Sequence, residues 1–194
     1  MRRIKLAILG IGSELMAQSL RFSGVIIGSN PWILGCPRVK LSHGGTIKIG
    51  NGVSLFSAPF ANPLFPDFRV VLHAQIAGSL IELGDSVGIS SSAIVASQHI
   101  HIGARTIIGA GCLVVDNDFH SLDSSLRGTG QDVPKIEPVS IGNDCFIGAR
   151  RIILKGSQIG DRSVIGAGSV VSGSIPSDSI ATGPPPKVIR SLKW

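Results

Sequence analysis

Apolar residues recur every six positions along most of this chain. In the C-terminal third the period continues without a slip through Ile141, Ile147, Ile153, Ile159, Ile165 and Val171. The same spacing relates Ile102, Ile108 and Val114, then Leu83, Ile89 and Val95, then Ile49 and Leu55, and Ile27, Ile33 and Val39. Glycine follows several of these positions, as at Gly142, Gly148, Gly160 and Gly166. A fixed short period of this kind predicts a fold built from many copies of one unit.

A period of six suits short strands and excludes a helix. Six residues turn an α-helix by about 600°, which would spread the apolar positions around its circumference. Six is an even number, so the same residues share one face of a strand. Because glycine and polar residues interrupt long flat strands, we expect a coil with one bend per repeat and three repeats per triangular turn. The predicted fold class is all-β, a parallel β-helix whose coils stack about 4.8 Å apart.

The N-terminus has a different period. The apolar residues Ile4, Ile8, Ile11 and Leu15 recur at helical spacing, which predicts an amphipathic helix within residues 3–22. Its apolar run is too short to cross a bilayer and is followed by Glu14, so we expect neither a transmembrane segment nor a cleaved signal peptide.

Two further segments interrupt the repeat and divide the chain. Residues 56–76 are rich in proline and phenylalanine, and residues 116–138 are polar and irregular. Both segments predict loops that leave the coil, and a loop as long as the second is usually functional in a compact domain. The expected organisation is an N-terminal helical segment at 1–25, a β-helix domain at 26–190 and a tail at 191–194.

Composition and charge exclude several classes of function. The chain of 194 residues is 43% hydrophobic and 15% charged, which is not the composition of a disordered protein. The net charge is +6, but the basic residues are dispersed without an aromatic stripe, which argues against nucleic acid and leaves a phosphate-bearing ligand near Lys187 and Arg190. Three cysteines without a C-x-x-C pair predict neither disulfides nor a zinc knuckle, so we expect a cytoplasmic protein.

His120 is the strongest candidate for chemistry among the five histidines. His99 and His101 alternate with isoleucines, so both should point outward from one coil face. His120 lies in the second loop, close in sequence to Asp118 and Asp123. A carboxylate beside an imidazole fixes its tautomer and stabilises its protonated form.

Three segments and the period together carry a resemblance to a known family. They are IGNDCFIG at 141–148, IGDRSVIGAGSVV at 159–171 and GPPPKVIR at 183–190. They resemble the hexapeptide-repeat acyltransferases, and most of all the sugar O-acetyltransferases that act on maltose, galactosides or polysaccharides. The resemblance extends over roughly residues 26–190. It implies a left-handed β-helix, a homotrimer and acetyl-CoA as the acyl donor, with no metal.

The resemblance also implies a general base. HSLDSSLR at 120–127 is similar to the His-Pro-Leu-Asp motif, which three further residues separate from an arginine and in which the histidine is the base of the maltose enzymes. His120 would remove the proton of a sugar hydroxyl, and Asp118, Asp123 or a backbone carbonyl would hold its second nitrogen. No cysteine is placed as a nucleophile, so we expect direct attack on the thioester.

Matching positions in the motifs predict the binding residues. The residues expected to contact acetyl-CoA are Phe146, Gly148, Ala149, Ala167, Ser172, Lys187 and Arg190. Ala149, Ala167 and Ser172 would line the pantetheine arm, and Lys187 and Arg190 would face the adenosine phosphates. Backbone N–H groups near Gly148 or Ala149 would stabilise the thioester oxyanion.

The acceptor is less well defined than the donor. Ser90 and Ser92 are expected to contact it, as is Asn117, which stands where many relatives have a second histidine. A free sugar, a nucleotide-linked sugar and a polysaccharide unit all remain open.

Two other functional classes stay open at this stage. One is a zinc protein that resembles the γ-class carbonic anhydrases, with His99, His101 and His120 as ligands. The other is a scaffold without catalytic activity.

Overall fold

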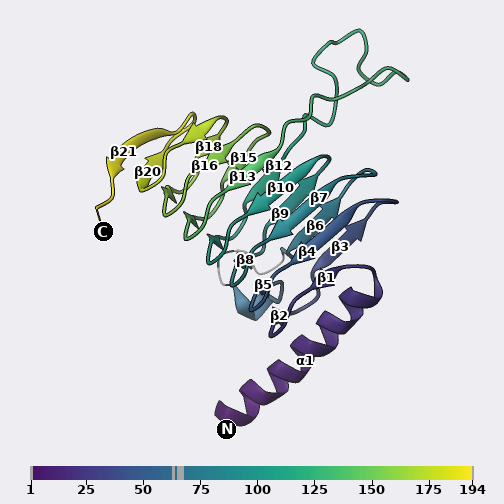
Figure 1. Ribbon diagram of the computed structural model, residues 1–194, viewed down its shortest axis with the longest axis vertical. Helices are drawn as coiled ribbons and strands as arrows, with labels where there is room; N and C mark the ends of the chain where they lie inside the picture. The colour runs from purple at the N-terminus through teal and green to yellow at the C-terminus, as the bar shows by residue number, and fades with distance from the viewer. Residues whose placement is uncertain (1, 63, 65–67, 194) are drawn as a thin grey trace.

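The computed structural model describes residues 2–62, 64 and 68–193. One helix, α1 (Arg2–Phe22), precedes a coil of short strands that form three parallel sheets (Figure 1). The predicted fold, a left-handed parallel β-helix with a short N-terminal helix, is confirmed. We call the three faces of the coil sheets A, B and C.

Each of the first six turns of the coil contributes one strand to each sheet, and the last turn contributes strands to sheets A and B only. Sheet A contains β1 (Ile26–Ile27), β4 (Thr46–Ile49), β7 (Leu80–Leu83), β10 (His99–Ile102), β13 (Val139–Ile141), β16 (Gln158–Ile159) and β19 (Ser174–Ile175). Sheet B contains β2 (Trp32–Leu34), β5 (Ser54–Phe56), β8 (Gly88–Ser90), β11 (Ile107–Ile108), β14 (Phe146–Ile147), β17 (Val164–Ile165), β20 (Ser179–Thr182) and β21 (Lys187–Ser191). Sheet C contains β3 (Arg38–Leu41), β6 (Val71–Ala74), β9 (Ala93–Ala96), β12 (Leu113–Val115), β15 (Ile152–Ile153) and β18 (Val170–Val171). Only β21 runs antiparallel to its neighbour among these pairings.

The core is a column of aliphatic side chains inside the coil. Parallel register places Ile102 beside Ile141, and Ile141 beside Ile159, so that like residues stack from one coil to the next. These three side chains are at most 3% exposed. Each coil therefore buries its apolar face mainly against its neighbours, which is the physical reason for the six-residue period.

The register shifts by one residue at β9. Val95, expected to point inward, faces outward, and Ile94 and Ala96 take the interior positions. Five residues rather than six separate Ile89 from Ile94. The corner between them is made tight by Ser91, which has a positive φ of 42°.

Both expected loops leave the coil, with different bounds. The first ends before β6, because residues 71–74 alternate between outward and buried positions like any other strand of the coil. It contains a short 3₁₀ helix, η1 (Pro59–Ala61), and residues 63 and 65–67 of it lie outside the described part of the chain. The second loop projects beyond the coil (Figure 1) from a base closed by a bridge between Asn117 and Ile136.

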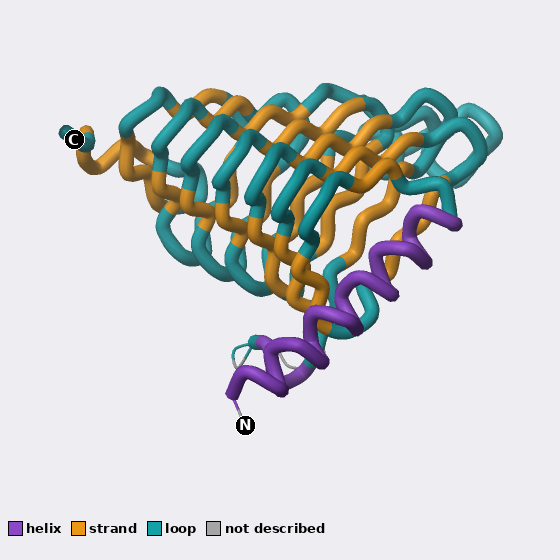
Figure 2. The backbone as a smooth tube through the Cα atoms, turned by 60° about the horizontal axis from the view of Figure 1, so that its bottom comes forward, coloured by secondary structure: helices purple, strands orange, loops and turns teal. Residues whose placement is uncertain are grey.

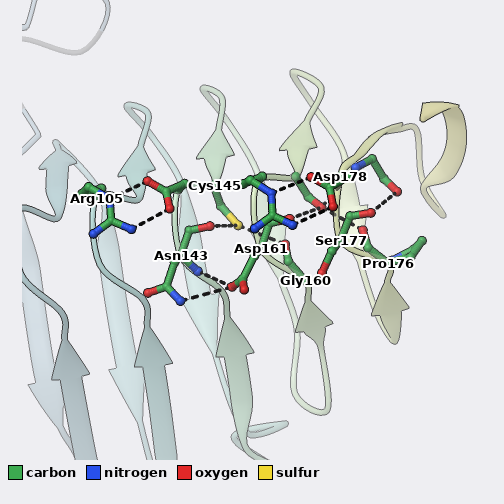
Figure 3. A network of polar contacts seen from close by, with 12 residues as sticks. Arg105, Asn143, Cys145, Gly160, Asp161, Pro176, Ser177 and Asp178 are labelled. Carbon is green, nitrogen blue, oxygen red and sulfur yellow. Dashed lines mark hydrogen bonds and ion pairs between the residues drawn. The ribbon is translucent and has the colours of Figure 1, made fainter. Parts of the chain in front are cut away.

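The corner between sheets A and B is held by a ladder of polar side chains (Figure 3). Asp161 Oδ1 accepts hydrogen bonds from the backbone and the side-chain amide of Asn143, at 2.7 and 3.3 Å. Gly142 permits this contact, because a Cβ there would lie 2.4 Å from the same oxygen. Ion pairs join Arg105 to Asp144 and Arg162 to Asp178 on this corner. The charged groups of these two ion pairs are therefore engaged with one another and stabilise the stacking of the coils.

Helix α1 closes the N-terminal end of the coil (Figure 2). Ala17 and Leu20 are buried there, and the buried hydroxyl of Ser13 donates to Pro31 O and accepts from Ile33 N, each at 2.7 Å. The helix thus covers apolar side chains that no preceding coil could bury. Within the described residues, no helix is both long and apolar enough to traverse a bilayer.

Candidate active site

His120 stands on the projecting loop and is hydrogen-bonded to Asp132. The distance from His120 Nδ1 to Asp132 Oδ2 is 2.8 Å. The imidazole is 66% exposed, whereas the carboxylate of Asp132 is 11% exposed. One ring nitrogen is therefore fixed by the loop, and the other remains available to a ligand.

Asp132 is the anchor of this loop. Its carboxylate accepts backbone hydrogen bonds from Ser121 N at 2.5 Å and from Gly128 N at 2.7 Å. These bonds, together with the His120 contact, lower the pKa of Asp132 to about 2. The ionised carboxylate can only accept, so His120 Nδ1 is the donor and Nε2 of the neutral ring is an acceptor. This is the arrangement that a general base requires.

The expected partners of His120 are engaged elsewhere. Asp118 forms an ion pair of 2.6 Å with Lys155 at the base of the loop. Asp123 accepts from the backbone and hydroxyl of Ser125, which lowers its pKa and closes a local turn. The expectation that Asp118 or Asp123 holds the second nitrogen is therefore corrected to Asp132. Side chains that are close in sequence point in different directions where a loop turns, so Asp118 and Asp123 do not face His120. The loop instead folds back and brings Asp132, twelve positions later, beside the ring.

Two of the three expected acceptor contacts are committed to the fold. The Ser92 hydroxyl donates to the carbonyls of Ser90 and Gly109 and accepts from Cys112 N, and its residue is 3% exposed. Asn117 is 4% exposed, and its side-chain oxygen accepts from Phe119 N. Neither side chain is free for a ligand, because both satisfy backbone groups of tight corners. Ser90 lies half-buried on the outer face of sheet B and stays a prediction.

Two of the three residues expected at the pantetheine arm, Ala149 and Ala167, lie on the corner between sheets B and C, whereas Ser172 does not. Gly168 N donates to Ala149 O at 3.4 Å, which stacks this part of one coil directly on the next, and Ala167 is exposed beside it. A Cβ at Gly148 would meet the guanidinium of Arg151, the far end of a flexible side chain, which would have to shift to accommodate it. The Gly148 N–H already donates to Ile165 O. This bond occupies the Gly148 N–H, so the oxyanion contact stays a prediction for Ala149.

The remaining cofactor candidates are spread over three places. Phe146 is 50% exposed on the outer face of sheet B. Ser172 lies exposed on another corner, after β18. Lys187 and Arg190 lie on β21, an exposed strand at the C-terminal end of the coil.

Within one chain, the expected general base and the expected acetyl-CoA site lie apart. His120 stands on the loop that leaves the corner between sheets C and A, whereas Ala149 and Ala167 lie on the corner between sheets B and C. In Figure 1 the loop extends away from the coil, on the side opposite the yellow C-terminal strand. No hydrogen bond or ion pair joins the described residues of the two halves.

The histidines proposed as zinc ligands do not converge. His99 and His101 project outward from β10, as predicted, and lie near Glu82 with one ligand atom of each residue within 4.8 Å of the others. These three residues could hold a metal ion, but Glu82 is already paired with Lys48 at 3.1 Å and with His99 at 2.9 Å. His120 is bonded to Asp132 on the separate loop. The zinc alternative is therefore not favoured.

Asp132 was missed because its signal is weak. Twelve residues separate it from His120, and no fixed spacing connects the two. Gly128 and Gly130 indicate a turn between them, but a turn alone does not identify which later carboxylate returns to the ring. Arg127 supports the same turn by donating to the carbonyls of Ser121 and Leu122.

Known proteins resemble this chain in sequence over much of its length. The family described as hexapeptide repeat of succinyl-transferase matches residues 138–172. The chain is 37% identical to a probable acetyltransferase, Rv3034c, of Mycobacterium tuberculosis, over 77% of this chain and 52% of that protein. It is 31% identical to galactoside O-acetyltransferase of Escherichia coli, over 86% of this chain and 63% of that protein. The chain thus spans between half and two thirds of these curated relatives.

A solved structure extends the likeness over nearly the whole chain. It is a hexapeptide-repeat containing acetyltransferase of Vibrio cholerae, VCA0836, complexed with acetyl coenzyme A. Its TM-score is 0.56 at 27% identity, and the match covers 99% of this chain and 85% of that one.

Proposed function

We propose that this chain is a hexapeptide-repeat acyltransferase and that it transfers an acetyl group from acetyl-CoA to a hydroxyl group of a sugar. The observation that carries the proposal is the His120–Asp132 pair, which presents an imidazole acceptor on a projecting loop. The relatives support the donor and the acceptor class, since one is named a galactoside O-acetyltransferase and another is complexed with acetyl coenzyme A.

The proposed reaction is a direct transfer. His120 Nε2 takes the proton of the sugar hydroxyl while the oxygen attacks the thioester carbonyl carbon. A C–O bond forms, and the C–S bond then breaks to release the CoA thiolate, which takes up the proton. The Ala149 N–H would stabilise the oxyanion during attack. The small side chains of Ala149 and Ala167 leave room along their corner for the pantetheine arm, which supports acetyl-CoA as the donor.

The simplest test of the activity follows the thiol product. Purified protein with acetyl-CoA and a panel of free sugars, sugar phosphates and nucleotide-linked sugars should release the CoA thiol only when a hydroxyl acceptor is added. Mass spectrometry should then find one acetyl group on the sugar. Thiol release at equal rates with and without every acceptor would reject the transferase and indicate simple thioester hydrolysis.

The positively charged strand β21 should bind the phosphates of CoA. Lys187 and Arg190 are exposed at the C-terminal end of the coil, where charge-assisted contacts to the 3′-phosphate and pyrophosphate are favourable. Replacing both with alanine should weaken acetyl-CoA binding more than dephospho-CoA binding, with the larger difference at low salt. Calorimetric titration measures this, and equal losses for the two ligands would show that β21 does not contact the 3′-phosphate.

The split site predicts an assembly of three copies. In this arrangement His120 of one copy meets the corner with Ala149 and Ala167 of a second copy, and a homotrimer would create three such sites. Exposed apolar residues support contacts through sheets B and C: Ile107 and Phe146 on sheet B are 53% and 50% exposed, and Ile152 on sheet C is 37% exposed. Light scattering should give about three times the chain mass of 20.2 kDa. A monomer at micromolar concentration that still transfers acetyl groups would contradict the shared site.

A further inference from the structure

A cavity on the corner between sheets B and C has no role in the chemistry above. Its volume is about 350 Å³, near the lower end of the range for small-molecule sites. Phe68 and Arg69 form one side of it, and Ser91, Gly111 and Cys112 form the other. It thus lies between the end of the first loop and two successive coils.

The cavity continues the line of the expected pantetheine arm. Backbone hydrogen bonds stack this corner from coil to coil: Gly111 N donates to Ser91 O, Arg150 N to Ala110 O, and Gly168 N to Ala149 O. If the phosphates of CoA bind at β21 and its arm follows Ala167 and Ala149, the acyl end points toward Ala110. The next coil in that direction holds Ser91 and the cavity.

Among the described residues, the charged side chains that line the cavity are all positive. Arg69 is exposed, and no described residue pairs with it. Arg38 and Arg69 together line an adjoining hollow of about 330 Å³, which shares Phe68 and Val71 with the first cavity. Neither lining includes a carboxylate among the described residues. Two neighbouring guanidinium groups with no counterion among the described residues favour an anion, and their planar forks match phosphate oxygens.

The wall of the cavity also contains an unsatisfied polar group. The hydroxyl of Ser91 is buried and has no hydrogen-bond partner among the residues that the structure describes, and the residue is 1% exposed. Buried hydroxyls are nearly always paired, so an orphan in a cavity wall suggests a polar ligand. A sugar hydroxyl supplies such a partner.

We propose that this cavity binds the acceptor and that Arg69, with Arg38, selects a sugar carrying a phosphate group. The inference rests on the proposed acetyltransferase function and specifies its acceptor class. Phe68 and Ser91 would contact the sugar, and the arginines would hold the phosphate, either as a sugar monophosphate or as the diphosphate of a nucleotide-linked sugar.

The test compares matched sugars and matched variants. Binding of glucose, glucuronic acid, glucose 1-phosphate and UDP-glucose is measured by calorimetry with the wild type, Arg69→Gln, Ser91→Gly and Lys40→Gln. Lys40 is an exposed cation on the same strand as Arg38 but outside both linings, so its variant controls for the loss of one charge. Glycine suits the positive φ of Ser91, so Ser91→Gly removes the hydroxymethyl side chain without straining the backbone.

The expected result has three parts. At least one phosphorylated sugar binds about tenfold or more tightly than glucose, and Arg69→Gln removes that difference, as charge-assisted bonds to one guanidinium would require. Lys40→Gln retains the difference. Ser91→Gly weakens glucose and its phosphorylated forms by the same factor, because it touches the sugar and not the phosphate.

Other outcomes overturn the proposal. They are equal binding of glucose and both phosphorylated sugars, no binding of either phosphorylated sugar up to about 10 mM, and binding of glucuronic acid as tight as that of the phosphates. Arg69→Gln could also weaken acetyl-CoA binding by the same factor as it weakens binding of the phosphorylated sugars. That result would overturn the proposal too, since the cavity would then belong to the donor. Acetyl-CoA binding is measured separately in the wild type, so a failure of the transferase function is recognised independently.

Discussion

Replacing His120 with alanine should lower kcat by about 10²–10⁴-fold, the usual contribution of a general base. A sugar hydroxyl is a poor nucleophile while protonated, and His120 Nε2 is the acceptor that the loop presents. Binding of acetyl-CoA should change little, because none of the residues expected at the donor contacts the ring. Steady-state kinetics with saturating acetyl-CoA, together with calorimetry, measure the two effects.

The control for His120→Ala is a histidine outside the loop. His101→Ala changes an outward-facing imidazole of sheet A and should leave kcat within about twofold, as for an ordinary surface position. A His120→Ala protein with the wild-type oligomeric mass and near-normal kcat would reject the mechanism. Radiolabelled acetyl-protein that accumulates without an acceptor would reject direct transfer alone.

Replacing Asp132 with asparagine should lower kcat by about 10²-fold or more, as observed where an amide replaces the carboxylate that orients a catalytic histidine. Asp132 fixes the donor role of His120 Nδ1 and accepts the backbone N–H groups of Ser121 and Gly128. An asparagine can donate to Nδ1 and so favours the tautomer that leaves Nε2 protonated. Kinetics of the single variants and of the double variant with His120→Ala measure the effect.

Asp123→Asn is the matched control for this prediction. Asp123 lies in the same loop, and the only described residue that donates to its carboxylate is Ser125, so its variant should keep nearly wild-type kcat. The double variant His120→Ala with Asp132→Asn should be no slower than His120→Ala, because the carboxylate acts through the ring. Equal effects of Asp123→Asn and Asp132→Asn would mean that the loop responds to any lost charge.

The low pKa of Asp132 sets the pH range of this contact. The pKa is about 2 in the folded chain and near 3.8 when the carboxylate is free. Asp132 therefore contributes stability to the loop above about pH 4, and this contribution disappears as the pH falls toward 2. Across the neutral range its charge is constant, so changes of activity there arise from other groups.

The sequence by itself determined the architecture. In a β-helix the inward-facing positions recur at a fixed spacing along the chain. Ile141, Ile159 and the other apolar residues of the six-residue period therefore reveal the coil through their spacing alone. The outward direction of His99 and His101 follows from the same alternation. His120 was also identifiable from the sequence. It lies in a long polar loop that interrupts the six-residue period, and its neighbours match a family motif.

Only the tertiary structure decided how the groups combine. Asp132 becomes the partner of His120 because the loop folds back on backbone N–H groups, and no local rule specifies that path. Ser92 and Asn117 carry the right chemistry for a ligand, but tight corners use their hydrogen bonds. Ser91, Arg69 and Ala149 lie far apart in the chain and share one corner only because coils stack. These residues align because their corners are stacked in space. That stacking depends on the length of every loop between them.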